Sequence, residues 1–102
     1  MEQHDLIVVT PVYEDVEACS RLFKELADQF NDRLFVVAVD DGSVRQPLDV
    51  DCLEAAGVKG VVIKLKRNVG HQKAIAIGLS YVSDKIGPDQ RVVVMDSDGE
   101  DL

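Results

Sequence analysis

The stretch of sequence that decides the fold is Val92-Val93-Val94-Met95-Asp96-Ser97-Asp98. Residues 92–95 are apolar, and such a continuous run is typical of a strand buried on both faces of a parallel sheet. Because ligands of parallel sheets bind at the carboxyl ends of the strands, Asp96 and Asp98 are expected to face a ligand. Two neighbouring carboxylates repel each other unless a cation lies between them. The pair is therefore typical of a Mg²⁺ or Mn²⁺ site that also holds a diphosphate, although a solvated strand exit has the same pattern.

Similar apolar runs precede this stretch, and segments of helical character separate them. Strands are expected at residues 6–9, 34–39, 61–65 and 91–95, and helices at residues 16–30, 47–56 and 72–82. Thr10-Pro11 is expected to end the first strand, because proline lacks the N–H that a central strand needs. Alternation of strands and helices predicts right-handed βαβ units on a parallel sheet, and therefore the α/β class.

Length and composition restrict the possible functions. The chain has 102 residues, which suits one domain, and its 46% hydrophobic content argues against disorder. A net charge of -8 disfavours nucleic acid as a partner, because phosphate backbones need basic patches. Cys19 and Cys52 fall in predicted helices and are expected to be buried thiols of a reducing compartment. No apolar run is long enough to span a membrane, and the polar N-terminus does not resemble a secretory signal.

Two more polar clusters follow predicted strands. Asp40 and Asp41 come directly after the second strand, where a carboxylate can accept a hydrogen bond from a base, such as N3–H of uracil or N1–H of guanine. Residues 66–73 combine basic side chains with a glycine and lead into a helix, which suits contact with a diphosphate. His71 in this segment is expected to be a packed or capping residue. Because the strands are parallel, the clusters are expected to converge on one edge of the sheet.

The motifs together resemble a known enzyme family. They are Val9-Thr10-Pro11-Val12-Tyr13-Glu14, Val39-Asp40-Asp41-Gly42-Ser43, Arg67-Asn68-Val69-Gly70-His71-Gln72-Lys73-Ala74 and Met95-Asp96-Ser97-Asp98-Gly99-Glu100-Asp101. In this order they resemble the successive motifs of family 2 glycosyltransferases, and the third is most similar to the polyprenyl-phosphate branch related to dolichol-phosphate mannose synthase. The resemblance implies the Rossmann-like, nucleotide-diphospho-sugar-binding half of the GT-A fold, with about four mainly parallel strands and flanking helices.

The resemblance also implies roles for the matching residues. The nucleotide-binding positions would be Pro11, Tyr13, Glu14, Asp40, Asp41, Lys73 and Asp96. Among them, Asp41, with Asp40 as a second candidate, would bind the base, and Lys73 would approach the base or the diphosphate. Asp96 and Asp98 would be the metal positions, with Mg²⁺ or Mn²⁺ bridging the diphosphate. The implied reaction is an inverting, metal-dependent transfer of sugar from a UDP- or GDP-linked donor, with polyprenyl phosphate as a candidate acceptor.

Family members continue beyond the aspartate motif with an acceptor-binding half that carries the catalytic base. Residues 1–102 are therefore expected to be a single donor-binding domain truncated after the D-x-D motif, without a catalytic base and inactive alone. The expected location is the cytoplasm, at the inner face of the membrane for a longer form with membrane association. Exposed apolar surface would favour homo-oligomers.

Three other classes of protein share part of this pattern. A non-catalytic nucleotide-sugar-binding module would share every residue discussed. A flavodoxin-like phosphoacceptor domain needs a lone acceptor aspartate after its third strand, where this sequence has Lys64-Leu65-Lys66. A nucleotidyltransferase usually has a glycine-rich basic loop after its first strand, and residues 10–15 contain neither glycine nor a basic residue.

Overall fold

The computed structural model describes residue 1 and residues 4–96 of the chain. Strands and helices alternate along these residues in the order β1 (Leu6–Val12), α1 (Val16–Phe30), the 3₁₀ turn η1 (Asn31–Arg33), β2 (Leu34–Asp40), α2 (Val50–Ala56), β3 (Lys59–Lys64), α3 (His71–Ser83) and β4 (Arg91–Val94). The alternation confirms the α/β class.

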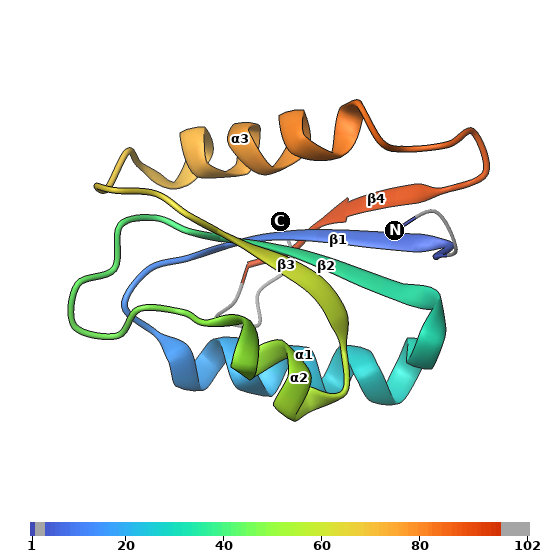
Figure 1. Cartoon of the computed structure of the whole chain (residues 1–102), viewed down its shortest axis with the longest axis horizontal. Coiled ribbons are helices and arrows are strands. Elements are labelled where there is room, and N and C mark those ends of the chain that lie inside the picture. The colour runs from blue at the N-terminus through green and yellow to red at the C-terminus, as the bar shows by residue number, and fades with distance from the viewer. Residues whose placement is uncertain (2–3, 97–102) are drawn as a thin grey trace.

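The strands form one parallel sheet in the order β3-β2-β1-β4. In Figure 1, α1 and α2 cover one face of the sheet and α3 covers the other. The connections β1–β2 and β2–β3 therefore cross one face, and the connection β3–β4 crosses the opposite face. This places a topological switch point between β1 and β4, where Rossmann-like sheets bind ligands outside the carboxyl ends of the strands.

The two central strands supply core residues to both faces. Side chains alternate along a strand, so Val8 and Val36 pack with Phe23 of α1, whereas Val9 and Val37 pack in the cluster on the α3 face. All five side chains are fully buried. Both central strands therefore read as continuous apolar runs in the sequence.

Gly78 allows α3 to lie very close to the sheet. A Cβ atom at this position would lie 2.6 Å from Cγ1 of Val9 and 3.0 Å from Cγ2 of Val39. Any larger residue would push the helix away from β1 and β2, and with it the loop that begins α3 at the cleft described below.

The prediction that Pro11 ends the first strand is wrong, because β1 continues to Val12 and Pro11 pairs with Val39 of β2. The Val9 carbonyl accepts a hydrogen bond from Met95 N–H, so odd-numbered residues of β1 direct their backbone groups toward β4. β4 ends at Val94, which pairs with Val9. The nitrogen of Pro11 therefore lies past the end of β4, and within residues 4–96 no paired strand residue lies opposite it on that side.

The prediction that residues 92–95 are buried on both faces is also wrong. β4 pairs only with β1 in the described part of the chain and is half-exposed along its length, with Val93 36% exposed. The apolar content of β4 resembles that of a central strand, but β4 lies at the edge of the described sheet.

Two elements start two or three residues away from the predicted position. The helix predicted from residue 47 starts at Val50, because Leu48 is buried and its N–H donates to the Asp40 carboxylate at 3.0 Å, which holds this segment outside the helix. β3 starts at Lys59, two residues early, because parallel pairing with β2 begins at Phe35.

Candidate functional site

A cleft of about 320 Å³ lies at the carboxyl edge of the sheet, where segments following all four strands meet. Its walls are formed by Pro11, Val12, Tyr13, Asp15, Asp41, Asn68, Gly70, His71 and Asp96. The convergence predicted from the parallel order is therefore observed for Asp41, Asp96 and the loop before α3. Of the seven residues expected to bind nucleotide, four line this cleft: Pro11, Tyr13, Asp41 and Asp96.

Asp41 is a buried carboxylate that organises the loop before α3. Its residue is 3% exposed, yet it lines the cleft. Oδ1 accepts from Val69 N–H at 2.8 Å, and Oδ2 accepts from Asn68 Nδ2 at 3.1 Å and Gly70 N–H at 3.2 Å. A charged acceptor shared by three donors fixes the loop relative to β2.

Asp40, the adjacent residue, is directed elsewhere. It is also 3% exposed but does not line the cleft. Its Oδ1 accepts from Ser43 N–H at 3.1 Å and its Oδ2 from Leu48 N–H at 3.0 Å. Consecutive residues of a strand point to opposite sides, so Asp40 anchors the β2–α2 loop while Asp41 faces the cleft.

Glu14 ties the β1–α1 loop to the β2–α2 loop. Its carboxylate accepts backbone N–H groups of Gln46 at 2.8 Å, Arg45 at 3.0 Å and Val44 at 3.1 Å. Its own N–H donates to Oγ of Ser43 at 2.8 Å. The backbone hydrogen bonds, chiefly those of Gln46 and Val44, hold the pKa of Glu14 below its ordinary value. Glu14 does not line the cleft.

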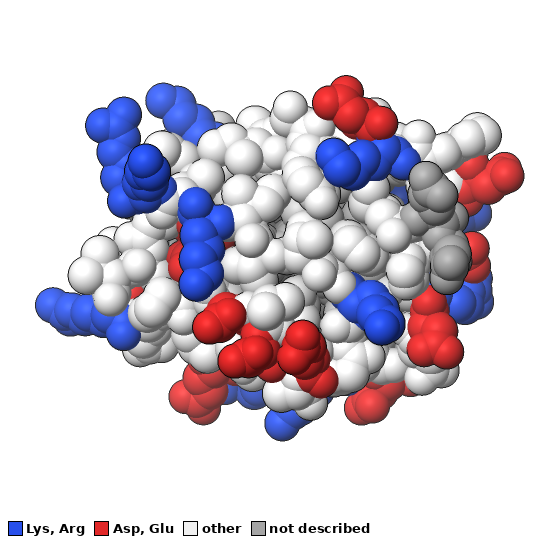
Figure 2. All heavy atoms as spheres, viewed as in Figure 1, with Lys and Arg blue, Asp and Glu red and all other residues white. Residues whose placement is uncertain are grey.

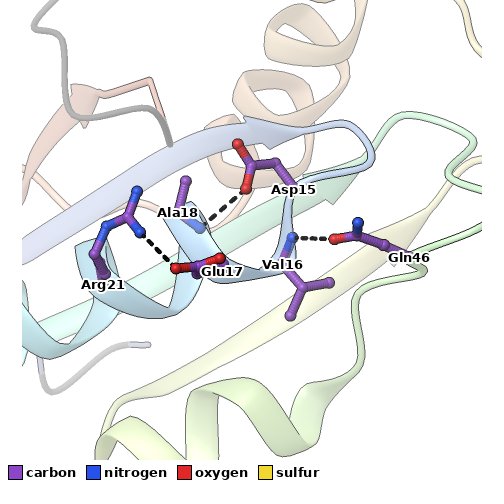
Figure 3. A network of polar contacts seen from close by, with 6 residues as sticks. All are labelled: Asp15, Val16, Glu17, Ala18, Arg21 and Gln46. Atoms are coloured by element: carbon purple, nitrogen blue, oxygen red, sulfur yellow. Dashed lines mark hydrogen bonds and ion pairs between the residues drawn. The ribbon is translucent and has the colours of Figure 1, made fainter.

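Asp15 starts α1 at the wall of the cleft. Its carboxylate accepts Ala18 N–H at 3.1 Å, which makes Asp15 the N-cap of α1 (Figure 3). Val16 N–H donates to Oε1 of Gln46 at 3.2 Å, and Arg21 contacts Glu17 at 3.2 Å one turn along the helix. These contacts fix the helix start, and therefore the position of Tyr13 just before it.

His71 and Asp96 face each other across the cleft. Nε2 of His71, the first residue of α3, lies 3.8 Å from Oδ2 of Asp96, which follows β4. The prediction of a packed or capping histidine is wrong, since its side chain is 47% exposed and lines the cleft. A local sequence pattern could not place His71 in the cleft beside Asp96, because the two residues are far apart in the sequence.

Basic side chains lie around this end of the molecule. Figure 2 shows Lys and Arg gathered over the end where α3 begins, a segment that contains Lys66, Arg67 and Lys73. Lys73 is exposed in the first turn of α3 and does not line the cleft. Lys73 therefore lies at the same end of the molecule as the cleft but not in its wall.

The metal assignment depends on Asp96, the last described residue, and on Asp98. Asp98 lies outside the described residues, and no group of three candidate metal-ligating side chains occurs among residues 4–96. Asp96 provides one half-buried carboxylate in the cleft. One or two carboxylates suffice for Mg²⁺ when phosphate oxygens and water complete its shell, so this donor set fits such an ion.

A larger hollow of about 840 Å³ lies at the opposite edge of the sheet. It is bordered by Met1, His4, Phe35, Lys59, Gly60, Tyr81, Asp84 and Lys85. It borders the amino ends of β2 and β3, away from the switch point. The smaller cleft is the better candidate site, because segments from all four strands contribute to it.

A protein-family model described as Glycosyl transferase family 2 matches residues 7–102. No curated protein matches the chain. Within residues 4–96 no helix has both the length and the apolar character required to cross a bilayer.

Proposed function

Because the chain belongs to glycosyltransferase family 2, we propose that its cleft binds the nucleoside diphosphate of an activated sugar. The observation that carries the proposal is the meeting of Asp41, Asp96 and the loop before α3 at the switch point of the sheet. A volume of about 320 Å³ is at the lower end of the range for small-molecule sites. The described cleft is therefore large enough for part of a nucleotide.

The proposed roles follow from position. Pro11 and Tyr13 form the wall of the base site, where the 54% exposed Tyr13 offers an aromatic face for stacking. Asp41 accepts a hydrogen bond from the base. Asp96 faces the ribose or the metal, and Lys73 approaches the diphosphate from the first turn of α3.

Asp40 and Glu14 act differently in this proposal. Both carboxylates already accept backbone N–H groups and neither lines the cleft. Their contribution to nucleotide binding is therefore to hold the two loops that carry Tyr13 and Asp41.

We further propose that Asp96 and Asp98 hold Mg²⁺ or Mn²⁺. When bound, the cation supplies Lewis-acid stabilisation of charge on the leaving diphosphate. The residues of this chain orient the donor, and the reaction is an inverting transfer to an acceptor, with polyprenyl phosphate as the candidate. In this scheme residues 1–102 act as the donor-binding domain, located in the cytoplasm or at the inner face of a membrane.

The test is calorimetric titration of UDP and GDP into the chain, with Mn²⁺ and with EDTA. We expect binding in Mn²⁺ that is lost in EDTA and in Asp98→Asn, and weakened in Asp96→Asn. Asp28→Asn is the matched control, because Asp28 is an exposed carboxylate of α1 outside the cleft. Equal affinity with EDTA, or in Asp98→Asn, would contradict the metal assignment.

A non-catalytic binding module would give the same titration. Sugar transfer distinguishes it from an enzyme: a radiolabelled donor and polyprenyl phosphate are incubated with a form of the protein that binds both. Transfer supports the glycosyltransferase, and donor binding without any transfer supports the module.

A further inference from the structure

Asp41 has little acceptor capacity left for a ligand. A carboxylate offers about four acceptor positions, two on each oxygen. Oδ2 is filled by Asn68 Nδ2 and Gly70 N–H, and one position of Oδ1 is filled by Val69 N–H. One position remains, on Oδ1.

The donors that occupy Asp41 are fixed by the backbone around them. A Cβ atom on Gly42 would lie 2.3 Å from the carbonyl carbon of Arg67 and 2.4 Å from the nitrogen of Asn68, so the two loops pack backbone to backbone. Asn68 Nδ2 also donates to the Asp41 carbonyl at 3.2 Å. The loop is therefore built around the carboxylate, and releasing Oδ2 would remove the acceptor of the Gly70 N–H and one of the two acceptors of the Asn68 amide.

Bases differ in the number of adjacent donors they present. Guanine presents N1–H and an N2 amino group side by side, and a carboxylate pairs with them through both of its oxygens. Uracil presents a single N3–H between two carbonyl groups, and one acceptor position satisfies it. Oδ2 is not available for the second donor of guanine.

Building on the proposed function, we infer that Asp41 selects uracil over guanine, so that the donor is a uridine diphosphate sugar. The base lies against Tyr13, and its N3–H donates to the remaining position on Oδ1 of Asp41. Neither the family match nor the sequence motifs choose between the two bases, and the loop before α3 does so by occupying Oδ2.

GDP and N3-methyl-UDP, each compared with UDP, test the inference without any change to the protein. UDP, GDP and N3-methyl-UDP are titrated calorimetrically into the 102-residue chain in Mn²⁺. We expect UDP to bind about tenfold more tightly than either of the others. N3-methyl-UDP forfeits the hydrogen bond to Oδ1, and GDP leaves its N2 amino group without an acceptor beside the occupied Oδ2. GDP that binds as tightly as UDP, or N3-methyl-UDP that does, would overturn the base assignment alone.

A variant tests whether the occupation of Oδ2 causes the preference for uracil. Asn68→Ala removes one donor from Oδ2 and opens a second acceptor position, so the preference for UDP over GDP should narrow. Arg67→Ala, which changes the neighbouring exposed side chain, should preserve it. An unchanged preference in Asn68→Ala, in a chain that retains its cooperative thermal transition, would contradict the role of Oδ2. If the folded chain binds no diphosphate at all, the donor site itself is wrong, and the inference falls with it.

Discussion

Replacing Asp40 by asparagine should destabilise the protein strongly while leaving the cleft in place. The carboxylate is buried and accepts Ser43 N–H and Leu48 N–H on separate oxygens. Asparagine keeps one oxygen, and its amide group meets the other N–H donor to donor. The loss is one bond to a charged acceptor plus one buried N–H without a partner, together about 2–4 kcal/mol. For a domain of this size, that lowers the melting temperature by about 10–20 °C.

The assay is urea denaturation followed by circular dichroism, with UDP titration under conditions where the variant is folded. Asp28→Asn, on the exposed face of α1, is the control and should change stability by less than about 0.5 kcal/mol. We expect the folded Asp40→Asn protein to retain most of its affinity for UDP, whereas Asp41→Asn loses it. An Asp40→Asn protein of wild-type stability that no longer binds UDP would refute the reasoning and return Asp40 to the base site.

Three further predictions concern other parts of the molecule. Gly78→Ala gains about 1 kcal/mol of helix propensity but forces a Cβ against the stiff side chains of Val9 and Val39. Thermal denaturation should therefore show a net loss of stability of about 1 kcal/mol. A melting temperature equal to or above that of the wild type would contradict the close packing. The pKa of Glu14 is lowered in the folded state, so its stabilising effect is present above the ordinary value of 4.5 and is lost as the pH falls through the lower folded pKa. The difference in urea midpoint between wild type and Glu14→Gln should therefore shrink on acidification, and a difference that grows would refute this sign. Burial raises the pKa of Cys19 to about 12, so a chromogenic disulfide reagent at pH 8 should label the half-buried Cys52 first and Cys19 only on unfolding; equal rates in the folded protein would contradict it.

The sequence predicted the fold well because its signals are local. Buried central strands must be apolar on both faces, and the run at residues 34–39 shows this directly. The fifteen-residue helix from Val16 to Phe30 has a single apolar stripe and an Asp15 cap, and its bounds are as predicted. The order of these elements then implied the parallel sheet and the shared edge where Asp41 and Asp96 meet.

The errors have a common physical cause, since each depended on which segments lie side by side in the folded chain. Pro11 is tolerated in β1 because β4 stops at Val94, a fact of register that no local pattern contains. β4 has the composition of a central strand but lies at the edge of the described sheet. Asp40 and Asp41 are equivalent as residue types, and only the positions of Leu48 and Asn68 in space give them different partners.

Those partners also bear on how a chain of net charge -8 would bind the diphosphate of the proposed donor. Four acidic side chains around or just behind the cleft accept N–H groups of neighbouring loops: Glu14, Asp15, Asp40 and Asp41. Each carboxylate is thereby stabilised by internal donors, and much of its field is compensated within the protein. The basic residues around the start of α3 remain exposed and can face the phosphates. In the proposed site the aspartates after β4 attract the bridging cation, so removing Asp98 should weaken diphosphate binding even though it makes the chain less negative. An Asp98→Asn protein that bound diphosphate more tightly would mean that net charge, and not a bridging cation, governs affinity.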